Sequence, residues 1–497
     1  MKRIVCLLFA AIMLLSVVAC GEKTPPVTGD TTPAVTDGSD PVDTTEAVTT
    51  EDPNKLPDYI PTDTYDGHEF VVLMTNLNPD QVIVRDFKWT EGGTVLDDAL
   101  YKRNMQAMET LDITITGIEN YSSSNSGVAD VRKANTAGDS NYDMCIISTY
   151  DAGKLALSDD LRDLRDFGCI DLDQVWWDQN MNRDITVNGK LYFTTGDISL
   201  VATQAMYNVV FNKDLFREKF GETSTLYNLV KEGNWTFDKM KEYVLQISED
   251  LDGNEKMDSN DLYGMVYIHS SVIAALGMSG ERMARIDENG DIVVSLGTER
   301  AEAAVVNFIE LTQDKEHVYN GQTATGGLTA VQMFSEGHCL FRWIEHIGFP
   351  HFRDTELEYG ILPLPKSDPA QDRYYTPFGG WDAAFVCIPT STENEERTSA
   401  IIEYLAFTSR QIVTPAYYEK TLTGRYVRDD ESYDMITLEM ENRGFDIGYI
   451  YNIGNMKNAV ENLSKGYSTA FSSMWNTYKR SAETACKATN ATLHKED

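Results

Sequence analysis

A twelve-residue loop, DLDGNEKMDSND at 250–261, has the ligand spacing of a calcium site. Oxygen-bearing side chains stand at positions 1, 3, 5, 9 and 12 of this loop, and position 7 offers a backbone carbonyl. Ca²⁺ takes about six to eight such oxygens from a tight turn. The loop therefore predicts a bound Ca²⁺ whose role is to stabilise the turn. The candidate ligands are Asp250, Asp252, Asn254, Lys256, Asp258 and Asp261.

Two features separate this loop from the EF-hand pattern. Glu255 stands at position 6, where glycine is usual, and Asp261 closes the loop in place of a bidentate glutamate. With Asp at the last position and Gly253 at the fourth, the loop resembles the calcium loops of bacterial dockerins. A solvated acidic turn that binds no metal is the alternative interpretation.

Four tryptophans offer flat faces to a ligand. Sugar rings stack their C–H faces on aromatic rings, while neighbouring carboxylates and amides accept their hydroxyl protons. Packing in the core is the alternative for each of the four. Trp235 is assigned to packing outright, because it precedes the N-cap candidate Thr236. The four ligand-binding candidates are Trp176, Trp177, Trp343 and Trp381.

No catalytic motif occurs in the sequence. The G-x-S-x-G elbow, the H-E-x-x-H zinc helix, the P-loop and the dinucleotide G-x-G-x-x-G are all absent. Glu345, His346 and His351 lie close together, but their spacing matches no metal motif and favours a hydrogen-bonded structural cluster. We therefore expect a binding protein and not an enzyme. A secreted carbohydrate-active enzyme, either a glycosidase or a lyase, is the alternative, and its carboxylate pair would form only in three dimensions.

Strand and helix signals alternate through the region that must position these residues. Apolar runs at 68–75, 113–118 and 142–149 alternate with helical periodicity at 94–111 and near 128–137. This βαβαβ order implies an α/β fold with a parallel sheet and right-handed crossovers. Further signals are a helix capped by Thr236, a hairpin at 284–295, a helix at 298–314, strands at 339–344, 359–365 and 382–389, a helix around 401–405, and helices from about 430.

The N-terminus has the pattern of an export signal. Two basic residues precede the apolar stretch Ile4–Ala19, which ends in small residues before Cys20. This pattern predicts a signal peptide over residues 1–19. The residues around Cys20 also resemble a bacterial lipobox, in which this cysteine carries the lipid. Residues 21–57 are rich in Thr, Pro and acidic side chains and hold no aromatic residue, so 20–57 is expected to be a lipidated cysteine followed by a disordered tether.

The charge and composition exclude several classes of protein. The 497 residues carry a formal net charge of -36, which repels phosphate backbones and argues against nucleic-acid binding. At 42% hydrophobic residues the chain is too apolar to be disordered throughout. No run of about 18 apolar residues follows the signal, which excludes a polytopic membrane protein. A neutral or cationic ligand suits this acidity best.

Seven segments, taken in order, resemble one family of exported proteins. This family is the extracellular solute-binding proteins of ABC importers, in particular the carbohydrate-binding family related to maltose-binding protein. The segments resemble four motifs that recur in that family in this order: the "NGK-Y" strand, the "YNKDLF" step, the "tW-F" helix start and the final "YG-LPLP…GG" segment. The segments are YDMCIIST (142–149), NGKLYFTTG (188–196), MYNVVFNKDLFREKFG (206–221), NWTFDKMKEY (234–243), FSEGHCLF (334–341), YGILPLPK (359–366) and PFGGWDAAFVCIPTSTENEERTSAIIEYL (377–405).

This resemblance implies the two-lobe, type II fold of periplasmic binding proteins, with a ligand held in a hinged cleft. It implies chain crossings near 196–206, near 343–359 and after about 408. The expected lobes are 58–198 plus 345–410 for lobe 1 and 199–344 plus 411–497 for lobe 2. The cleft residues that it implies are Tyr150, Asp151, Asp197, Trp343, Gly380 and Trp381, with Trp176 and Trp177 at positions where family members vary.

The expected function follows from the signal, the tether and the resemblance together. They predict a bacterial receptor, monomeric and lipid-anchored at the extracellular face of the cell membrane. The receptor would capture a carbohydrate, in particular an oligosaccharide, and deliver it to an ABC permease in the membrane.

Overall fold

A computed structural model describes most of the chain beyond the tether. The described residues are 55–75, 86–88, 92–121, 126–322, 327–353 and 355–494, and at 420, 421 and 423–425 the backbone alone is described. The expected signal peptide, the lipidation candidate Cys20 and the tether up to residue 54 lie outside the described residues. Residues from Leu56 onward form one unit by their contacts, and this unit holds both of the main sheets.

The first sheet has four strands in the order β13-β3-β1-β2. β1 pairs in parallel with both β2 and β3, and β13 joins the other edge of β3 in the antiparallel direction. The connecting helices are α2 (Val95–Leu111) and α3 (Ser126–Ala137), so the predicted βαβαβ order is confirmed. The strands are β1 (His68–Met74), β2 (Ile113–Glu119), β3 (Met144–Ser148) and β13 (Ala384–Cys387).

The second sheet has the order β11-β4-β10-β6-β5, and β9 pairs with β6 outside this path. Every residue of β4 and β6 is buried, as expected for strands that are covered on both faces. Its strands are β4 (Tyr207–Asn212), β5 (Ser248–Glu249), β6 (Leu262–Tyr267), β9 (Val318–Asn320), β10 (Cys339–Glu345) and β11 (Tyr359–Leu362). Two smaller pairs are β7 (Ala284–Ile286) with β8 (Ile292–Val294), which is the predicted hairpin, and β12 (Thr376–Pro377) with β14 (Arg443–Gly444).

Side-chain caps begin the predicted helices. Thr94 forms a capping box with Asp97 at the start of α2, and Thr236 caps α9 (Phe237–Val244). Among the described residues, no helix has the length and apolarity needed to cross a bilayer. The other helices are α4 (Thr149–Ala156), η1 (Leu164–Asp166), α5 (Gln179–Ile185), α6 (Val201–Gln204), α7 (Lys213–Phe220), α8 (Ser224–Lys231), α10 (Ser271–Met278), α11 (Glu299–Gln313), α12 (Ala330–Ser335), η2 (His346–Phe352), α13 (Glu395–Pro415), η3 (Ala416–Tyr426), α14 (Asp430–Glu441), α15 (Ile447–Ile450), η4 (Ile453–Asn455), α16 (Met456–Lys465) and α17 (Phe471–Leu493).

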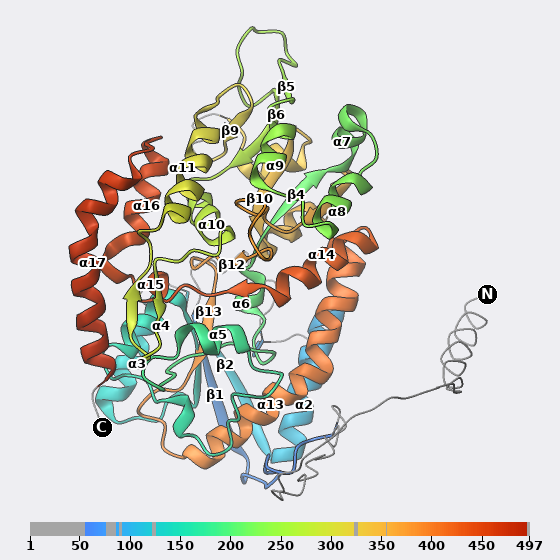
Figure 1. Cartoon of the computed structure of the whole chain (residues 1–497). Coiled ribbons are helices and arrows are strands. Elements are labelled where there is room, and N and C mark those ends of the chain that lie inside the picture. The colour runs from blue at the N-terminus through green and yellow to red at the C-terminus, as the bar shows by residue number, and fades with distance from the viewer. Residues whose placement is uncertain are drawn as a thin grey trace, which may run out of the picture. The chain divides into compact units, whose positions relative to one another are not determined.

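The chain passes from one sheet to the other at the predicted crossing 196–206 and again between α13 and α14 (Figure 1). The passage back to the first sheet lies between β11 and β13, later than the predicted 343–359. The reason is that β11 still pairs antiparallel with β4 in the second sheet. Residues 359–362, which the sequence placed in lobe 1, therefore belong to the second sheet. The other lobe boundaries stay a prediction.

Candidate functional site

The carboxyl ends of the parallel strands in the two sheets meet at one place, which we call the junction. Small-molecule sites in open α/β sheets lie beyond these strand ends. In the first sheet β3 ends at Ser148, two residues before Tyr150, and in the second sheet β10 ends at Glu345. The backbone N–H of Gly379 donates to the carbonyl of Ala205 at 2.6 Å. This bond joins the segment that leads into β13 to the segment that leads into β4.

Tyr150 reaches Tyr449 across the junction. Its hydroxyl donates to the Tyr449 hydroxyl at 3.0 Å, and the two ring centroids are 5.7 Å apart. The Tyr449 ring also packs edge-on against Phe378 at 5.5 Å. Gly380 has no room for a side chain, because a Cβ there would lie 1.6 Å from Cε1 of Tyr449. The structure thus brings the predicted residues Tyr150 and Gly380 together on a tyrosine that the sequence did not single out.

Two carboxyl groups meet at the same place. Burial raises the pKa of Glu345 to about 7, and the negative charge of Asp382 adds to this rise. A hydrogen bond with Tyr207 lowers the pKa of Glu345 and so limits the rise. A carboxyl group with this pKa both donates and accepts hydrogen bonds near neutral pH. Trp381 stands beside Asp382 with 52% of its surface exposed. The junction therefore combines buried ionisable oxygens with an exposed tryptophan at the adjoining position of the chain.

Two other predicted cleft residues are buried. Asp151 is 1% exposed and lies 3.4 Å from the ammonium of Lys154, one turn further along α4. Trp343 is 3% exposed in the core of the second sheet, where its ring centroid lies 5.1 Å from that of Phe308. Its indole nitrogen points to the sulfur of Met240 at 3.4 Å. In this conformation neither side chain offers a free face to a ligand.

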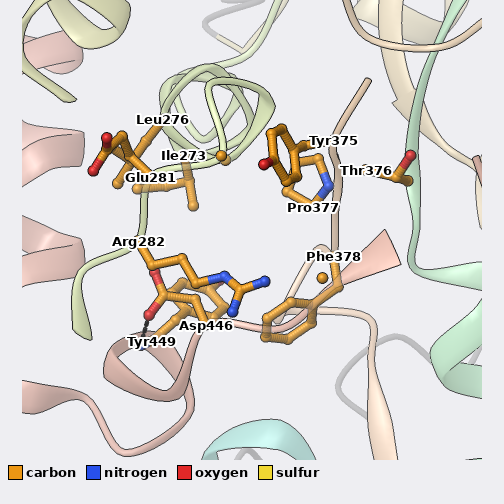
Figure 2. Close-up of a pocket in the computed structure, with 13 residues that line it drawn as sticks. Ile273, Leu276, Glu281, Arg282, Tyr375, Thr376, Pro377, Phe378, Asp446 and Tyr449 are labelled. Carbon is orange, nitrogen blue, oxygen red and sulfur yellow. Dashed lines mark hydrogen bonds between the residues drawn. The ribbon is translucent and has the colours of Figure 1, made fainter. Parts of the chain in front are cut away.

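A narrow cavity borders the junction (Figure 2). It holds about 30 Å³, room for about two water molecules, so a sugar requires the walls to part. The Arg282 guanidinium in its wall pairs with Asp184 at 2.8 Å. Asp446 caps α15 and accepts from the backbone N–H of Met283 at 2.8 Å. The residues that line this narrow cavity include Ile273, Leu276, Glu281, Arg282, Tyr375, Pro377, Phe378, Asp446 and Tyr449.

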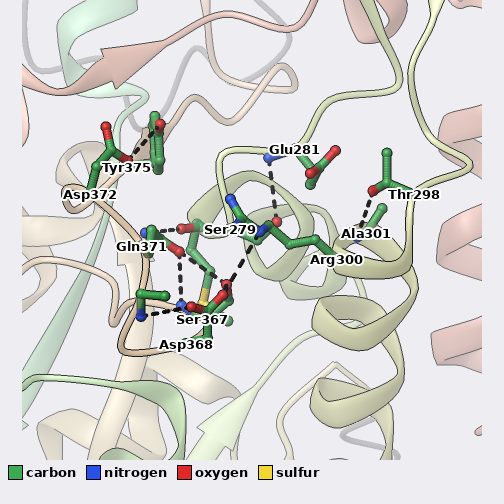
Figure 3. Close-up of polar contacts among 12 residues, drawn as sticks. Ser279, Glu281, Thr298, Arg300, Ala301, Ser367, Asp368, Gln371, Asp372 and Tyr375 are labelled. Atoms are coloured by element: carbon green, nitrogen blue, oxygen red, sulfur yellow. Dashed lines mark hydrogen bonds and ion pairs between the residues drawn. The ribbon is translucent and has the colours of Figure 1, made fainter.

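A polar network holds the segment that carries Tyr375 against α10 and α11 (Figure 3). The Gln371 amide donates to the carbonyl of Met278 at 2.9 Å, and the Tyr375 hydroxyl donates to Asp372 at 3.1 Å. Arg300 and Asp368 form a looser ion pair at 3.8 Å. These contacts fix the start of the passage back to the first sheet.

Trp176 and Trp177 are held by a buried carboxyl group. Their indole N–H groups each donate to Glu403 at 3.0 Å, and the Tyr59 hydroxyl donates to it at 2.7 Å. The two tryptophans are 4% and 2% exposed. Burial raises the pKa of Glu403 to about 7, and its hydrogen bonds limit that rise. The rings therefore pack in the core, while these two residues also border a second and larger cavity.

Asp197 lies in the wall of that second cavity. It accepts a hydrogen bond from Thr414 at 2.7 Å, and it lies 3.4 Å from the guanidinium of Arg410. The lining of this cavity includes neither Tyr150 nor Trp381. The predicted ligand-binding residues are thus divided between the junction, the second cavity and the core.

Three carboxylates of the predicted calcium loop come together. Oxygen atoms of Asp250, Asp252 and Asp261 all lie within 4.8 Å of one another. Asp261 is fully buried and accepts from the backbone N–H groups of Leu251 and Asp258. Through its side-chain amide, Asn254 donates to Asp252 at 2.9 Å. The acidic residues therefore have a spacing that a cation could bridge, with Lys256 in the same turn.

Several residues of the junction were not predicted from the sequence to contact a ligand. Tyr449 lies in the C-terminal helices, which resemble the family only in being helical. Tyr207, Glu345 and Asp382 come from three segments, and no local spacing relates them. A rule based on strand ends would have found Tyr207 and Glu345, because β4 and β10 are antiparallel neighbours with these two residues directly opposite.

No protein-family model and no curated protein matches the sequence. Solved structures do match. An ABC substrate-binding protein from Listeria monocytogenes in complex with cycloalternan has a TM-score of 0.54 at 13% identity, over 87% of this chain and 100% of that one. A cyclic alpha-maltosyl-1,6-maltose binding protein from Arthrobacter globiformis has a TM-score of 0.55 at 14% identity, over 86% and 99%.

A third structure is the maltose/maltodextrin-binding domain MalE from Bdellovibrio bacteriovorus bound to maltotriose. It has a TM-score of 0.51 at 11% identity, over 86% of this chain and 98% of that one. These matches show the two-lobe, type II fold of periplasmic binding proteins, as predicted. At the level of the fold, they also confirm the resemblance to the solute-binding proteins of ABC importers.

Proposed function

We propose that this chain is the extracellular receptor of an ABC importer and that it captures an oligosaccharide without altering it. The observation that carries the proposal is the junction, where the consecutive glycines Gly379 and Gly380 lie against Glu345 and Tyr449, Tyr150 bonds to Tyr449, and the exposed Trp381 follows in the chain. Solved proteins of the same fold carry cycloalternan and maltotriose. The narrow cavity beside the junction would widen as the lobes part and close again on the sugar.

The chemistry of these groups suits a neutral sugar. Tyrosine hydroxyls and carboxyl oxygens exchange hydrogen bonds with sugar hydroxyls, and the exposed Trp381 face stacks on C–H groups. A deprotonated Glu345 accepts a hydrogen bond from a sugar hydroxyl, while a protonated Glu345 donates one. With a pKa of about 7, this carboxyl group serves either role near neutral pH. Delivery to a membrane permease completes the proposed role.

We further propose that Cys20 carries the lipid and that residues 21–57 tether the receptor to the outer face of a bacterial cell membrane. The support is the order of basic residues, apolar core and small residues before Cys20. Membrane fractionation of the Cys20→Ser variant tests this part of the proposal. The variant is expected to leave the membrane fraction.

Removal of the exposed indole should weaken sugar binding. Trp381→Ala is expected to raise the Kd for maltotriose by about tenfold or more, because the loss of one well-placed aromatic contact costs about 1.4 kcal/mol or more. Thermal denaturation with and without maltotriose and maltotetraose measures this as a smaller rise in Tm. Leu245→Ala, another exposed apolar side chain, is the matched control.

Incubation with the same sugar separates a receptor from an enzyme. A glycosidase would use the two carboxyl groups at the junction to cleave the sugar. Recovery of intact maltotriose after prolonged incubation supports the receptor, and shorter products would contradict it. If no member of a broad sugar panel raises Tm in the unaltered chain, the carbohydrate assignment fails.

We also propose that the loop 250–261 binds a structural Ca²⁺. Chelation with EDTA should lower Tm, and added Ca²⁺ should restore it, because a ligand that binds only the native state adds stability by mass action. Asp252→Asn should abolish the response to Ca²⁺, whereas Asp287→Asn in the hairpin turn should leave it intact. An unaltered chain whose Tm is the same in EDTA and in Ca²⁺ would rule the site out.

A further inference from the structure

A third cavity lies between the end of α8, the segment that follows β11, and α14. It holds about 560 Å³. Small-molecule sites span roughly 300–1,000 Å³, so this cavity has the size of a ligand site. Its lining shares no residue with the narrow cavity or with the second cavity. A ligand bound here is therefore separate from one bound at the junction.

The helix α14 stands between the second cavity and the third. Tyr433 and Thr437 line the second cavity, whereas Asp434 and Leu438 line the third. Residues four apart lie on the same face of a helix, while consecutive residues point in different directions. The two cavities therefore border different faces of α14.

Lys366 is the buried charged residue in the wall of the third cavity. It is 8% exposed, and the other five charged residues of the lining are exposed. Its backbone N–H donates to the carbonyl of Trp235 at 3.0 Å, and its carbonyl accepts from the N–H of Phe237 at 2.8 Å. These two bonds fix Lys366 against the start of α9, so its side chain enters the wall from a defined position.

The ammonium of Lys366 has no partner of opposite charge. Nζ lies 5.2 Å from the centroid of the Tyr374 ring, and in the described part of the chain no hydrogen bond or ion pair reaches it. Gly233 leaves space beside it, because a Cβ there would lie 3.2 Å from Nζ. Buried charges are normally paired, because burial removes their hydration. An unpaired ammonium in a cavity wall therefore points to an anionic ligand group.

The other charges of the lining lie in exposed positions. Lys231 pairs with Asp434 at 3.5 Å, and Arg373 pairs with Asp372 at 3.6 Å. Glu232 brings the lining to three cations and three carboxylates, so its net formal charge is zero. Solvent and salt screen exposed charges far more than buried ones. The buried ammonium therefore dominates the electrostatic potential inside the cavity.

The lining also limits the charge and the shape of the ligand. One ammonium balances one negative charge, whereas a phosphate dianion would bring a second charge close to the three carboxylates. The side chains of Val230, Met435 and Leu438 add aliphatic surface, and the ring of Tyr374 adds aromatic surface. These apolar groups suit a ligand whose body is itself apolar.

We propose that the third cavity binds a monocarboxylate with a small apolar or aromatic body, through an ion pair between its carboxylate and Lys366. The body of the ligand packs against the aliphatic side chains of α8 and α14. The site does not rest on the proposed import function.

The test measures the binding of benzoate to the full chain by saturation-transfer NMR. Benzyl alcohol, which has the same ring and no charge, is expected not to bind. Lys366→Met keeps a long side chain and removes the charge, so it should raise the Kd for benzoate about tenfold or more. Lys239→Met, at a lysine of α9 that pairs with Glu242 outside the lining, is the matched control and should leave the Kd unchanged.

A second variant changes the Kd in the opposite direction at an exposed position. Asp434→Asn removes a carboxylate from the lining and frees the ammonium of Lys231, so it should lower the Kd for benzoate by about twofold. This variant decides the proposal if Lys366→Met fails to fold. A Kd that is unchanged or raised in Asp434→Asn would overturn the site.

Three further results would overturn the proposal: no binding of benzoate to the unaltered chain, equal binding by Lys366→Met and Lys239→Met, or binding of benzyl alcohol or inorganic phosphate as tight as that of benzoate. Failure of the import proposal is seen separately, because it concerns maltotriose. Lys366→Met should leave the Kd for maltotriose unchanged, and Trp381→Ala should leave the Kd for benzoate unchanged.

Discussion

Arg103→Met should lower the free energy of unfolding by about 3–5 kcal/mol, the range for removal of one partner from a buried charge pair. Arg103 is fully buried in α2 and donates to the carbonyl of Ile198 at 3.1 Å and to the hydroxyl of Ser409 at 3.0 Å. It also donates to the backbone carbonyl of Asp86. The Arg103 guanidinium thus contacts two passages between the sheets, the first through Ile198 and the last through Ser409. Urea unfolding measures the loss.

The pH dependence identifies the cause. Burial raises the pKa of Asp86 to about 6, and the charge of Arg103 limits that rise. Without Arg103 the pKa of Asp86 should rise further above its unfolded value. The folded state then binds the extra proton, so the variant should regain stability as the pH falls from 7 towards 4.

A surface arginine provides the matched control for this substitution. Arg132→Met, which breaks the exposed pair with Asp160, should cost less than about 1 kcal/mol. A deficit of the same size at every pH in Arg103→Met would contradict the role given to Asp86.

Gly380→Ala should abolish tight sugar binding while leaving the chain folded. The added Cβ would overlap the Tyr449 ring, which is 6% exposed and packed between Tyr150 and Phe378. Overpacking of this kind costs about 1–3 kcal/mol. The ring must leave Tyr150, so the expected rise in Kd for maltotriose is about 100-fold, measured by calorimetry.

A double substitution separates this clash from a general loss of fold. In Gly380→Ala with Tyr449→Ala the overlap disappears, so Tm should equal that of Tyr449→Ala alone, and binding stays weak because the Tyr449 hydroxyl is gone. Such non-additive stability is the signature of two residues in contact. If the lowering of Tm in the double variant equals the sum of the lowerings in the two single variants, the clash with Tyr449 is not the reason that position 380 needs a glycine.

Local patterns predicted the parts of this fold that local physics determines. The N-caps Thr94 and Thr236, the Asn-Gly hairpin at 284–295 and the buried strand runs lie where expected. Each depends on residues a few positions apart. The site depends instead on long-range partners, so its members could be guessed singly but not assembled.

The tandem tryptophans show this limit clearly. Trp176 and Trp177 have the composition of a sugar platform, but Glu403, more than 200 residues later, draws both indole N–H groups into the core. The position of β11 has a similar origin. The apolar run of β11 predicts a strand, but the sheet that it joins depends on its backbone hydrogen bonds with the free edge of β4, which lies about 150 residues earlier in the chain.

The last passage between the sheets is helical, since α13 continues directly into η3, a π-helix that ends at Tyr426, and Pro415 stands where the one gives way to the other. Proline and π-helical turns are the usual places where a helix bends, so this passage bends at one point, whereas the passage between β11 and β13 holds only the short β12 and can change direction at many torsions. The helical passage thus restricts the relative motion of the two lobes to rotation about few axes. A joint with few degrees of freedom loses little conformational entropy when it closes, which leaves more of the contact energy to appear as affinity.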